Sequence, residues 1–86
     1  MAEYRVEVRR SAARELDDID SRFGTRILAS IDALTYEPRP RQSRKLTGSQ
    51  DSYRLRVGPY RILYQVNDRT KEIIVYAIGH RREVYR

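Results

Sequence analysis

The stretch YRLRVGPYRILY, residues 53–64, decides the fold of this chain. Apolar and cationic residues alternate before Gly58-Pro59, and after it Tyr60, Ile62 and Tyr64 share one predicted face while Arg61 and Leu63 share the other, which indicates two strands joined by a tight turn. The apolar side chains of the first strand share one predicted face, and Arg54 and Arg56 share the other. The stretch therefore predicts an antiparallel hairpin with one face toward a core.

The segments around this hairpin complete an α+β pattern. Strands are predicted at residues 4–9, 53–57, 60–66 and 72–78, and two amphipathic helices are predicted between residues 12 and 34 with a break at 20–24. The order β-α-α-β-β-β predicts a twisted, mainly antiparallel sheet that packs on an N-terminal helical hairpin. Residues 1–86 are expected to form this single domain.

The boundaries of these elements follow from local signals. Ser11 is the predicted N-cap of the first helix, and Pro38 and Pro40 are expected to end the second. Residues 37–52 are polar and contain Gly and Pro, so a loop is expected there. Residues 72–78 are apolar on both faces, which predicts an interior strand covered by helices on one side.

The composition excludes several kinds of site. Cysteine is absent and His80 is the single histidine, which rules out disulfides, thiol nucleophiles and two-histidine metal sites. Asp17, Asp18 and Asp20 are expected to be surface charge, so neither a metal nor a cofactor is expected. No apolar run approaches the roughly 20 residues of a membrane span, and residues 1–10 do not resemble a signal peptide. A soluble cytoplasmic protein without membrane contact is expected.

The charge is strongly segmental. The chain carries 18 Lys+Arg against 12 Asp+Glu, for a net charge of +6, and 16 of the 18 cations are arginine. Residues 1–36 carry a net charge of −1, whereas residues 37–86 carry +7. This distribution favours a surface that faces a polyanion such as nucleic acid, the alternative being a solvated basic surface.

Arginines of the hairpin are the first candidates for a functional site. If Arg61 lies on the same face as Arg54 and Arg56, three guanidiniums converge, although like charges on neighbouring strands repel by roughly 0.2–1 kcal/mol. A bound phosphate would offset this repulsion. Tyr85, in the basic run that follows the last strand, could stack on a base or exchange a proton. The remaining strand tyrosines are assigned to packing: Tyr4, Tyr53, Tyr60, Tyr64 and Tyr76.

Three motifs resemble the RelE group of the RelE/ParE toxin superfamily: KLTG at 45–48, the hairpin at 53–64 and IGHRREVY at 78–85. The resemblance covers nearly the whole chain. It implies the toxin of a type II toxin-antitoxin system, a RelE-like fold, cleavage of mRNA in the ribosomal A site, and a cognate antitoxin in a hetero-oligomer. The catalytic positions of the family map onto Arg54, Arg56, Arg61, Arg81 and Tyr85.

The mechanism that the resemblance implies is metal-independent attack of a 2′-OH on the adjacent phosphate. Arg61, with Arg54 and Arg56, would stabilise the transition state, Arg81 would assist the leaving oxygen, and Tyr85 is the candidate base. Arg54 and Arg56 stand where members often carry lysine, so they are expected to supply charge rather than transfer protons. The predicted RNA-binding residues are Arg44, Lys45, His80 and Arg82.

Two other functions compete with the ribonuclease hypothesis. A ParE-like inhibitor of DNA gyrase would have the same fold, and it would break DNA rather than cut transcripts. A non-catalytic nucleic-acid-binding module would lose affinity roughly uniformly as its arginines are removed.

Overall fold

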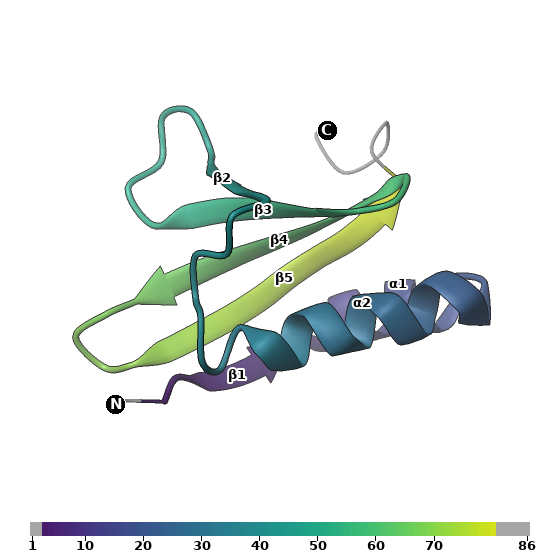
Figure 1. Cartoon of the computed structure of the whole chain (residues 1–86), viewed down its shortest axis with the longest axis horizontal. Helices are drawn as coiled ribbons and strands as arrows, with labels where there is room; N and C mark the ends of the chain where they lie inside the picture. Colours follow the sequence, from purple (N-terminus) through teal and green to yellow (C-terminus); the bar gives the residue numbers. More distant parts are fainter. Residues whose placement is uncertain (1–2, 81–86) are drawn as a thin grey trace.

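The computed structural model describes residues 3–80, which form two helices and a five-stranded sheet (Figure 1). The expected α+β fold is confirmed. The elements in chain order are β1 (Arg5–Val8), α1 (Arg10–Asp17), α2 (Ser21–Ala33), β2 (Ser43–Lys45), β3 (Ser52–Val57), β4 (Tyr60–Asn67) and β5 (Glu72–His80). None of the described helices is long and apolar enough to cross a membrane.

The sheet has the strand order β1-β5-β4-β3-β2. The strand β1 runs parallel to β5, and the other pairs are antiparallel. The predicted hairpin at 53–64 is confirmed as β3 and β4, with Leu55 opposite Ile62. The predicted interior strand is confirmed as well, because β5 lies between β1 and β4.

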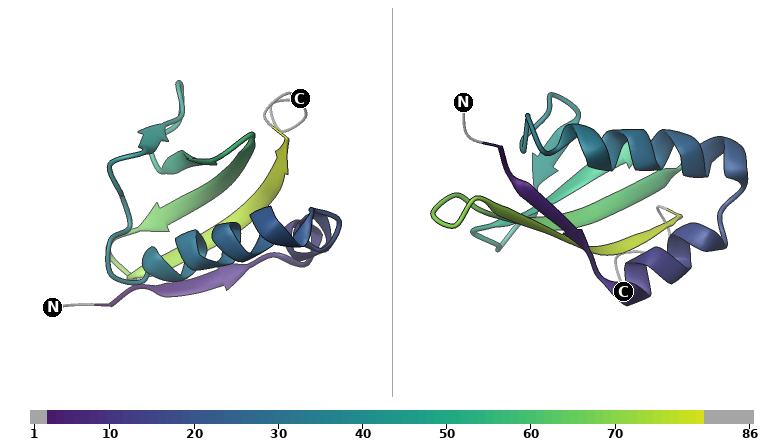
Figure 2. Two further views of the ribbon diagram at one scale, coloured as in Figure 1. Left: turned by 45° about the vertical axis from the view of Figure 1, so that its right-hand side comes forward. Right: turned by 90° about the horizontal axis from the view of Figure 1, so that it is seen from below.

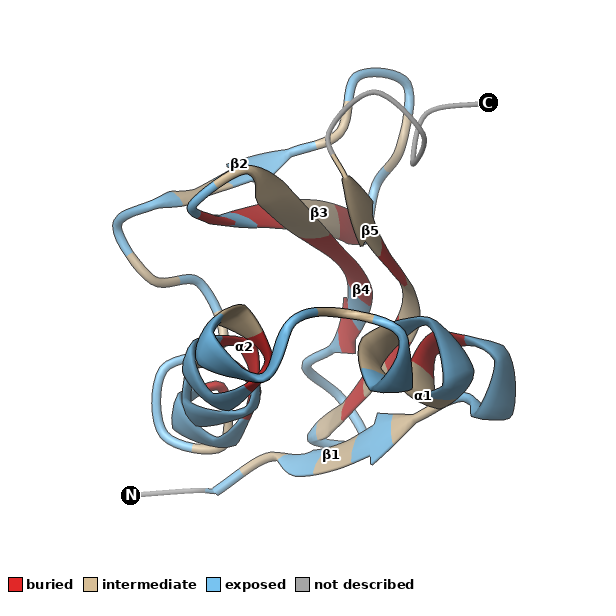
Figure 3. Ribbon diagram, turned by 90° about the vertical axis from the view of Figure 1, so that its right-hand side faces the viewer, coloured by how far each residue is buried: buried red, intermediate tan, exposed pale blue. Residues whose placement is uncertain are grey.

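Both helices lie on the same face of the sheet, α1 against β5 and α2 against β3 (Figures 2 and 3). The core fills the space between these layers, where Ile27, Ile31 and Leu34 meet the inward side chains of β3, β4 and β5. Tyr64 is the largest fully buried side chain. The alternation read from residues 53–64 therefore separates a buried face from one turned away from the helices.

Two helix boundaries differ from the prediction. The helix α1 begins at Arg10, so Ser11 lies inside it, and the N-cap Arg9 is extended without a side-chain cap. The break between the helices falls at residues 18–20, and Gly24 is inside α2. The carboxylate of Asp20 accepts a hydrogen bond from the Arg22 N–H at 2.9 Å. This cap explains why α2 begins before Gly24, because the capping hydrogen bond offsets the cost of glycine in a helix, which is about 1 kcal/mol.

The predicted loop at 37–52 contains a short strand that the sequence did not reveal. Strand β2 (Ser43–Lys45) pairs with β3 at the edge of the sheet. Three residues are too few to show a strand period, so β2 exists because β3 offers it a hydrogen-bonding partner.

Candidate nucleic-acid interface

Four arginines from three neighbouring strands share the sheet face turned away from the helices. Arg44 of β2 lies opposite Arg54 of β3, and Arg56 of β3 lies opposite Arg61 of β4. Directly opposed residues point to the same side of a sheet, and so do residues two apart in a strand. We call this cluster of Arg44, Arg54, Arg56 and Arg61 the arginine face.

The arginine face combines exposed and half-buried cations. Arg44 and Arg56 are exposed, whereas Arg54 and Arg61 are half-buried. Leu63, opposite Arg54 on the same side of the sheet, is only 6% exposed and lies outside the core cluster. Arginine stems can cover apolar surface while their guanidiniums reach solvent, which accounts for a buried leucine among cations.

Gly58 and Phe23 hold the turn beside the Arg56–Arg61 pair. Gly58 has φ +58°, and a Cβ at this position would lie 2.8 Å from the Cε1 atom of Phe23. The Phe23 ring also contacts the Tyr60 ring, with the centroids 5.4 Å apart. The turn therefore needs glycine for two reasons, its left-handed backbone and the ring packed against it.

Two hollows flank Arg54. One, of about 230 Å³, is lined by Gln42, Arg44, Arg54 and Arg56. The other, of about 390 Å³, is lined by Lys45, Leu46, Thr47 and Arg54. Each combines guanidinium or ammonium donors with one polar uncharged side chain, a combination suited to phosphate oxygens.

The segment that leads into β2 is anchored by Arg39. Its guanidinium donates two hydrogen bonds to the Asp68 carboxylate, at 3.2 and 2.8 Å, and one to the Tyr53 hydroxyl at 2.8 Å. Tyr4 also donates to Asp68. The Arg39 guanidinium, and then the Tyr4 hydroxyl, lower the pKa of Asp68 below its usual range, because both stabilise the ionised carboxylate.

A second anchor lies next to it. The hydroxyl of Tyr64 donates to the carbonyl oxygen of Pro38 at 2.8 Å, and burial raises the pKa of this phenol. Tyr64 also stacks on Tyr53 with the ring centroids 5.8 Å apart. Together the two anchors fix residues 38–39 on the sheet and so set where β2 can pair.

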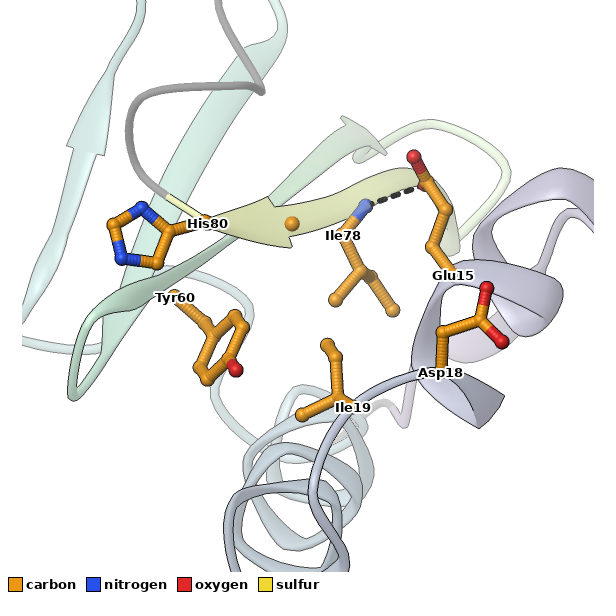
Figure 4. A pocket seen from close by; sticks show the side chains of 7 residues that line it. Glu15, Asp18, Ile19, Tyr60, Ile78 and His80 are labelled. Atoms are coloured by element: carbon orange, nitrogen blue, oxygen red, sulfur yellow. Dashed lines mark hydrogen bonds between the residues drawn. The ribbon is translucent and has the colours of Figure 1, made fainter.

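His80 lies on the other side of the sheet from the arginine face. It pairs with Tyr60, whose ring it meets edge-on at a centroid distance of 5.9 Å. Both line a cleft of about 390 Å³ whose opposite wall carries Glu15 and Asp18 of the α1 region (Figure 4). The structure does not bring His80 together with Arg44 and Lys45, because β3 and β4 lie between their strand and β5, although all three were predicted to bind RNA.

The predicted site residues Arg81, Arg82 and Tyr85 lie outside the described residues. Within residues 3–80, no group of three His, Cys, Asp or Glu side chains could hold a metal ion.

Sequence reasoning missed Gln42, Thr47 and Arg39. The spacing of two between Gln42 and Arg44 is a signal that could have placed Gln42 on the arginine face, had β2 been recognised. No local signal pairs Arg39 with Asp68, because 29 positions separate them.

Comparisons with known proteins agree on one group. The family model described as "ParE toxin of type II toxin-antitoxin system, parDE" matches residues 6–85. A protein of Methanocaldococcus jannaschii named "Putative toxin RelE1" is 27% identical over an alignment of 86 positions. The alignment covers 96% of each chain.

Solved structures give the same picture. The archaeal RelE–RelB complex from Pyrococcus horikoshii OT3 contains a chain that is 33% identical, with a TM-score of 0.84 over 95% of this chain and 99% of that one. The toxin–antitoxin complex RelBE2 from Mycobacterium tuberculosis contains a chain that shares the fold at 24% identity. Its TM-score is 0.80, over 93% of this chain and 100% of that one.

Proposed function

This chain belongs to the RelE/ParE superfamily of toxins from type II toxin-antitoxin systems, and from that premise we propose that it cuts mRNA in the ribosomal A site. The observation that carries this proposal is the arginine face, where Arg56 and Arg61 lie directly opposite each other on adjacent strands. Two directly opposed arginines can both contact one phosphate, and an anion bound between them would offset their like charge.

The proposed reaction is cleavage by the neighbouring 2′-OH. The bond from the 2′-oxygen to phosphorus forms as the bond from phosphorus to the 5′-oxygen breaks, leaving a 2′,3′-cyclic phosphate and a 5′-OH. Arg61, with Arg54 and Arg56, stabilises the extra negative charge that develops on the phosphate. Tyr85, acting as its phenolate, would accept the 2′-OH proton, and Arg81 would stabilise the charge on the leaving 5′-oxygen, which takes up a proton from solvent water. The reaction as proposed needs no metal ion.

Phosphates on either side of the scissile one are held by the two hollows beside Arg54. Arg44 lines the smaller hollow and Lys45 the larger, so the RNA backbone would run along β2 and β3, beside the Arg56–Arg61 pair. Arg82 remains part of this contact as a sequence-based assignment. His80 would meet RNA only from the helix side of the sheet.

A cognate antitoxin is the proposed protein partner. Solved relatives are complexes of RelE with RelB, and the same kind of pairing here would give a toxin–antitoxin hetero-oligomer. Because residues 37–86 carry a net charge of +7, an antitoxin segment with excess acidic residues would neutralise the arginine face. Ribosome-bound mRNA would compete for the same surface.

Inhibition of DNA gyrase is the second candidate, and the match to the ParE family model favours it. We rank it below the ribonuclease because the solved chain that is 33% identical comes from a RelE–RelB complex. The two functions leave different damage, namely cut transcripts in one case and broken DNA in the other.

The test expresses the chain in bacteria and maps mRNA 5′ ends in translating extracts. We expect cuts within A-site codons for the unmodified chain and a loss of about 100-fold or more for Arg61→Ala. Arg69→Ala is the matched control, because Arg69 is an exposed cation in the turn between β4 and β5 and lies off the arginine face. Normal growth without A-site ends would contradict the proposal, and DNA breaks in their place would establish the second candidate.

A further inference from the structure

The sheet face turned away from the helices also carries apolar side chains that the core does not use. Leu63, Ile74 and Ala77 are buried or half-buried, as is Tyr76, and none of the four belongs to the core cluster or packs against it. Four of the five tyrosines that were assigned to packing contact or form the core cluster, whereas half-buried Tyr76 does neither. We call Leu63, Ile74, Tyr76 and Ala77 the apolar strip.

A β-bulge places Tyr76 on this side. Leu63 pairs with Ala77 and Tyr64 pairs with Val75, so Tyr76 is an extra residue in β5. Val75 and Ile78 are both fully buried on the helix side although they are three residues apart. The alternation therefore slips by one between them, and Tyr76 and Ala77 both face away from the helices.

The apolar strip adjoins the arginine face. Arg54, Leu63 and Ala77 form one row across β3, β4 and β5, and adjacent strands are about 4.8 Å apart. Arg61 is two residues from Leu63 in the same strand, or about 7 Å. The phosphate-binding cations and the aromatic ring of Tyr76 are therefore within reach of one nucleotide and its neighbour.

We propose that Tyr76, supported by Leu63 and Ala77, is a stacking platform for the nucleobase next to the phosphate held by the arginine face. This proposal rests on the proposed function and adds a base-binding subsite to it. Aromatic side chains beside a basic groove bind single-stranded nucleic acid by stacking, and this contact tolerates any base.

The size and surroundings of the apolar strip favour a base over a protein segment. The four side chains are bounded by Arg54 and Arg61 on one side and by Gln65 on the other. A stable protein interface needs roughly 800 Å² on each partner, which is far more than these four residues provide. The adjacent guanidiniums match the phosphate that every nucleobase brings with it.

The experiment uses the full chain and a short single-stranded RNA that contains 2-aminopurine, whose fluorescence falls when it stacks. Tyr76→Leu keeps an apolar side chain but removes the ring, and Tyr76→Phe keeps the ring. Tyr36→Leu is the matched control, because Tyr36 is 73% exposed beyond the end of α2, off the apolar strip. We expect quenching with the unmodified chain, with Tyr76→Phe and with Tyr36→Leu. With Tyr76→Leu we expect lost quenching and RNA binding that is weaker by about tenfold.

The outcomes separate this inference from the proposed function. If the unmodified chain cuts transcripts and Arg61→Ala does not, but Tyr76→Leu quenches and binds as the unmodified chain does, the platform is overturned and the ribonuclease stands. If Tyr76→Leu weakens capture of the co-expressed antitoxin and leaves RNA binding unchanged, the apolar strip is a protein contact and the platform is again overturned. If quenching follows the expected pattern but no transcript is cut, the platform stands and the ribonuclease fails. An unfolding midpoint in urea for Tyr76→Leu equal to that of the unmodified chain excludes a folding defect, and a lower midpoint with lost binding would overturn the platform in favour of a packing role.

Discussion

The two faces of the sheet are built from the same strands, but one is apolar and packed and the other carries a cluster of arginines. In β4, Ile62 is fully buried under the helices, while its neighbour Arg61 faces the other way among cations. The helix side is apolar and closely packed, and it supplies the free energy of folding. The other side places four arginines at neighbouring positions outside the core cluster. Along this strand, one position separates a residue that stabilises the core from a residue of the proposed phosphate-binding face.

Ile62→Ala should have the largest effect on stability. A fully buried isoleucine that is cut back to alanine leaves a cavity and costs about 2–5 kcal/mol, a large share of the stability of a small domain. Urea unfolding followed by circular dichroism measures the loss. Gln65→Ala, at an exposed position in the same strand, should stay within about 0.5 kcal/mol. An equal loss in both variants would break the distinction between the two faces.

Arg61→Ala should show the opposite pattern. Cleavage should fall by about 100-fold or more, while the stability loss should stay well below that of Ile62→Ala, because Arg61 lies outside the core cluster. Both quantities are measured on the same purified variant. A stability loss as large as that of Ile62→Ala would mean that Arg61 is a structural residue. That result would contradict the proposal that the arginine face binds phosphate.

Gly58→Ala should cause a smaller loss of stability. It tests the turn between β3 and β4, which joins the strands that carry both faces. An alanine at φ +58° costs about 1–2 kcal/mol, and its Cβ would also displace the Phe23 ring. Gly48→Ala is the matched control, since Gly48 has φ +81° with nothing within 4 Å of the added Cβ. Unfolding of both variants isolates the ring contact. Equal losses would show that Phe23 contributes nothing to the turn.

Asp68→Asn should have the smallest effect, and the effect should depend on pH. The pKa of Asp68 is lowered by Arg39 and Tyr4 in the folded chain, so its stabilisation is fully present above the unfolded pKa near 3.9. It is lost as the pH falls through the lower folded pKa. Asp68→Asn should therefore be less stable than the unmodified chain at pH 6, and the gap should close below pH 4. A gap that persists at pH 2 would contradict this assignment.

Much of the fold was predictable because the deciding patterns are local. Alternation in residues 53–64 predicted the hairpin and its two faces, and the apolar spacing between residues 12 and 34 predicted two helices. The shared side of Arg54 and Arg56 follows from the strand period alone. The helix boundaries were predicted less accurately. Asp20 favours a helix that starts at residue 21, whereas Gly24 disfavours helix at that point, and the sequence does not show which effect is larger.

The parts of the candidate site that could not be predicted depend on long-range pairing. The register of β3 against β4 was needed to place Arg61 opposite Arg56, and β2 was needed to add Arg44. The run at 72–78 is apolar at almost every position, so its pattern is the same with or without a bulge. Nothing in that run could therefore indicate that Tyr76 faces away from the core.

The sequence by itself determined which residues alternate, where the excess positive charge is carried and which chemistries have no residues to perform them. These are properties of composition and of short periods, which need no partner. Only the tertiary structure decided which side chains share a face across strands, and that His80 lies with Tyr60 on the helix side. It also decided that Arg39, through its hydrogen bond to Asp68, holds the segment before β2 in place. The physical reason is that strand register and bulges are set by cross-strand hydrogen bonds and core packing between segments far apart in the chain.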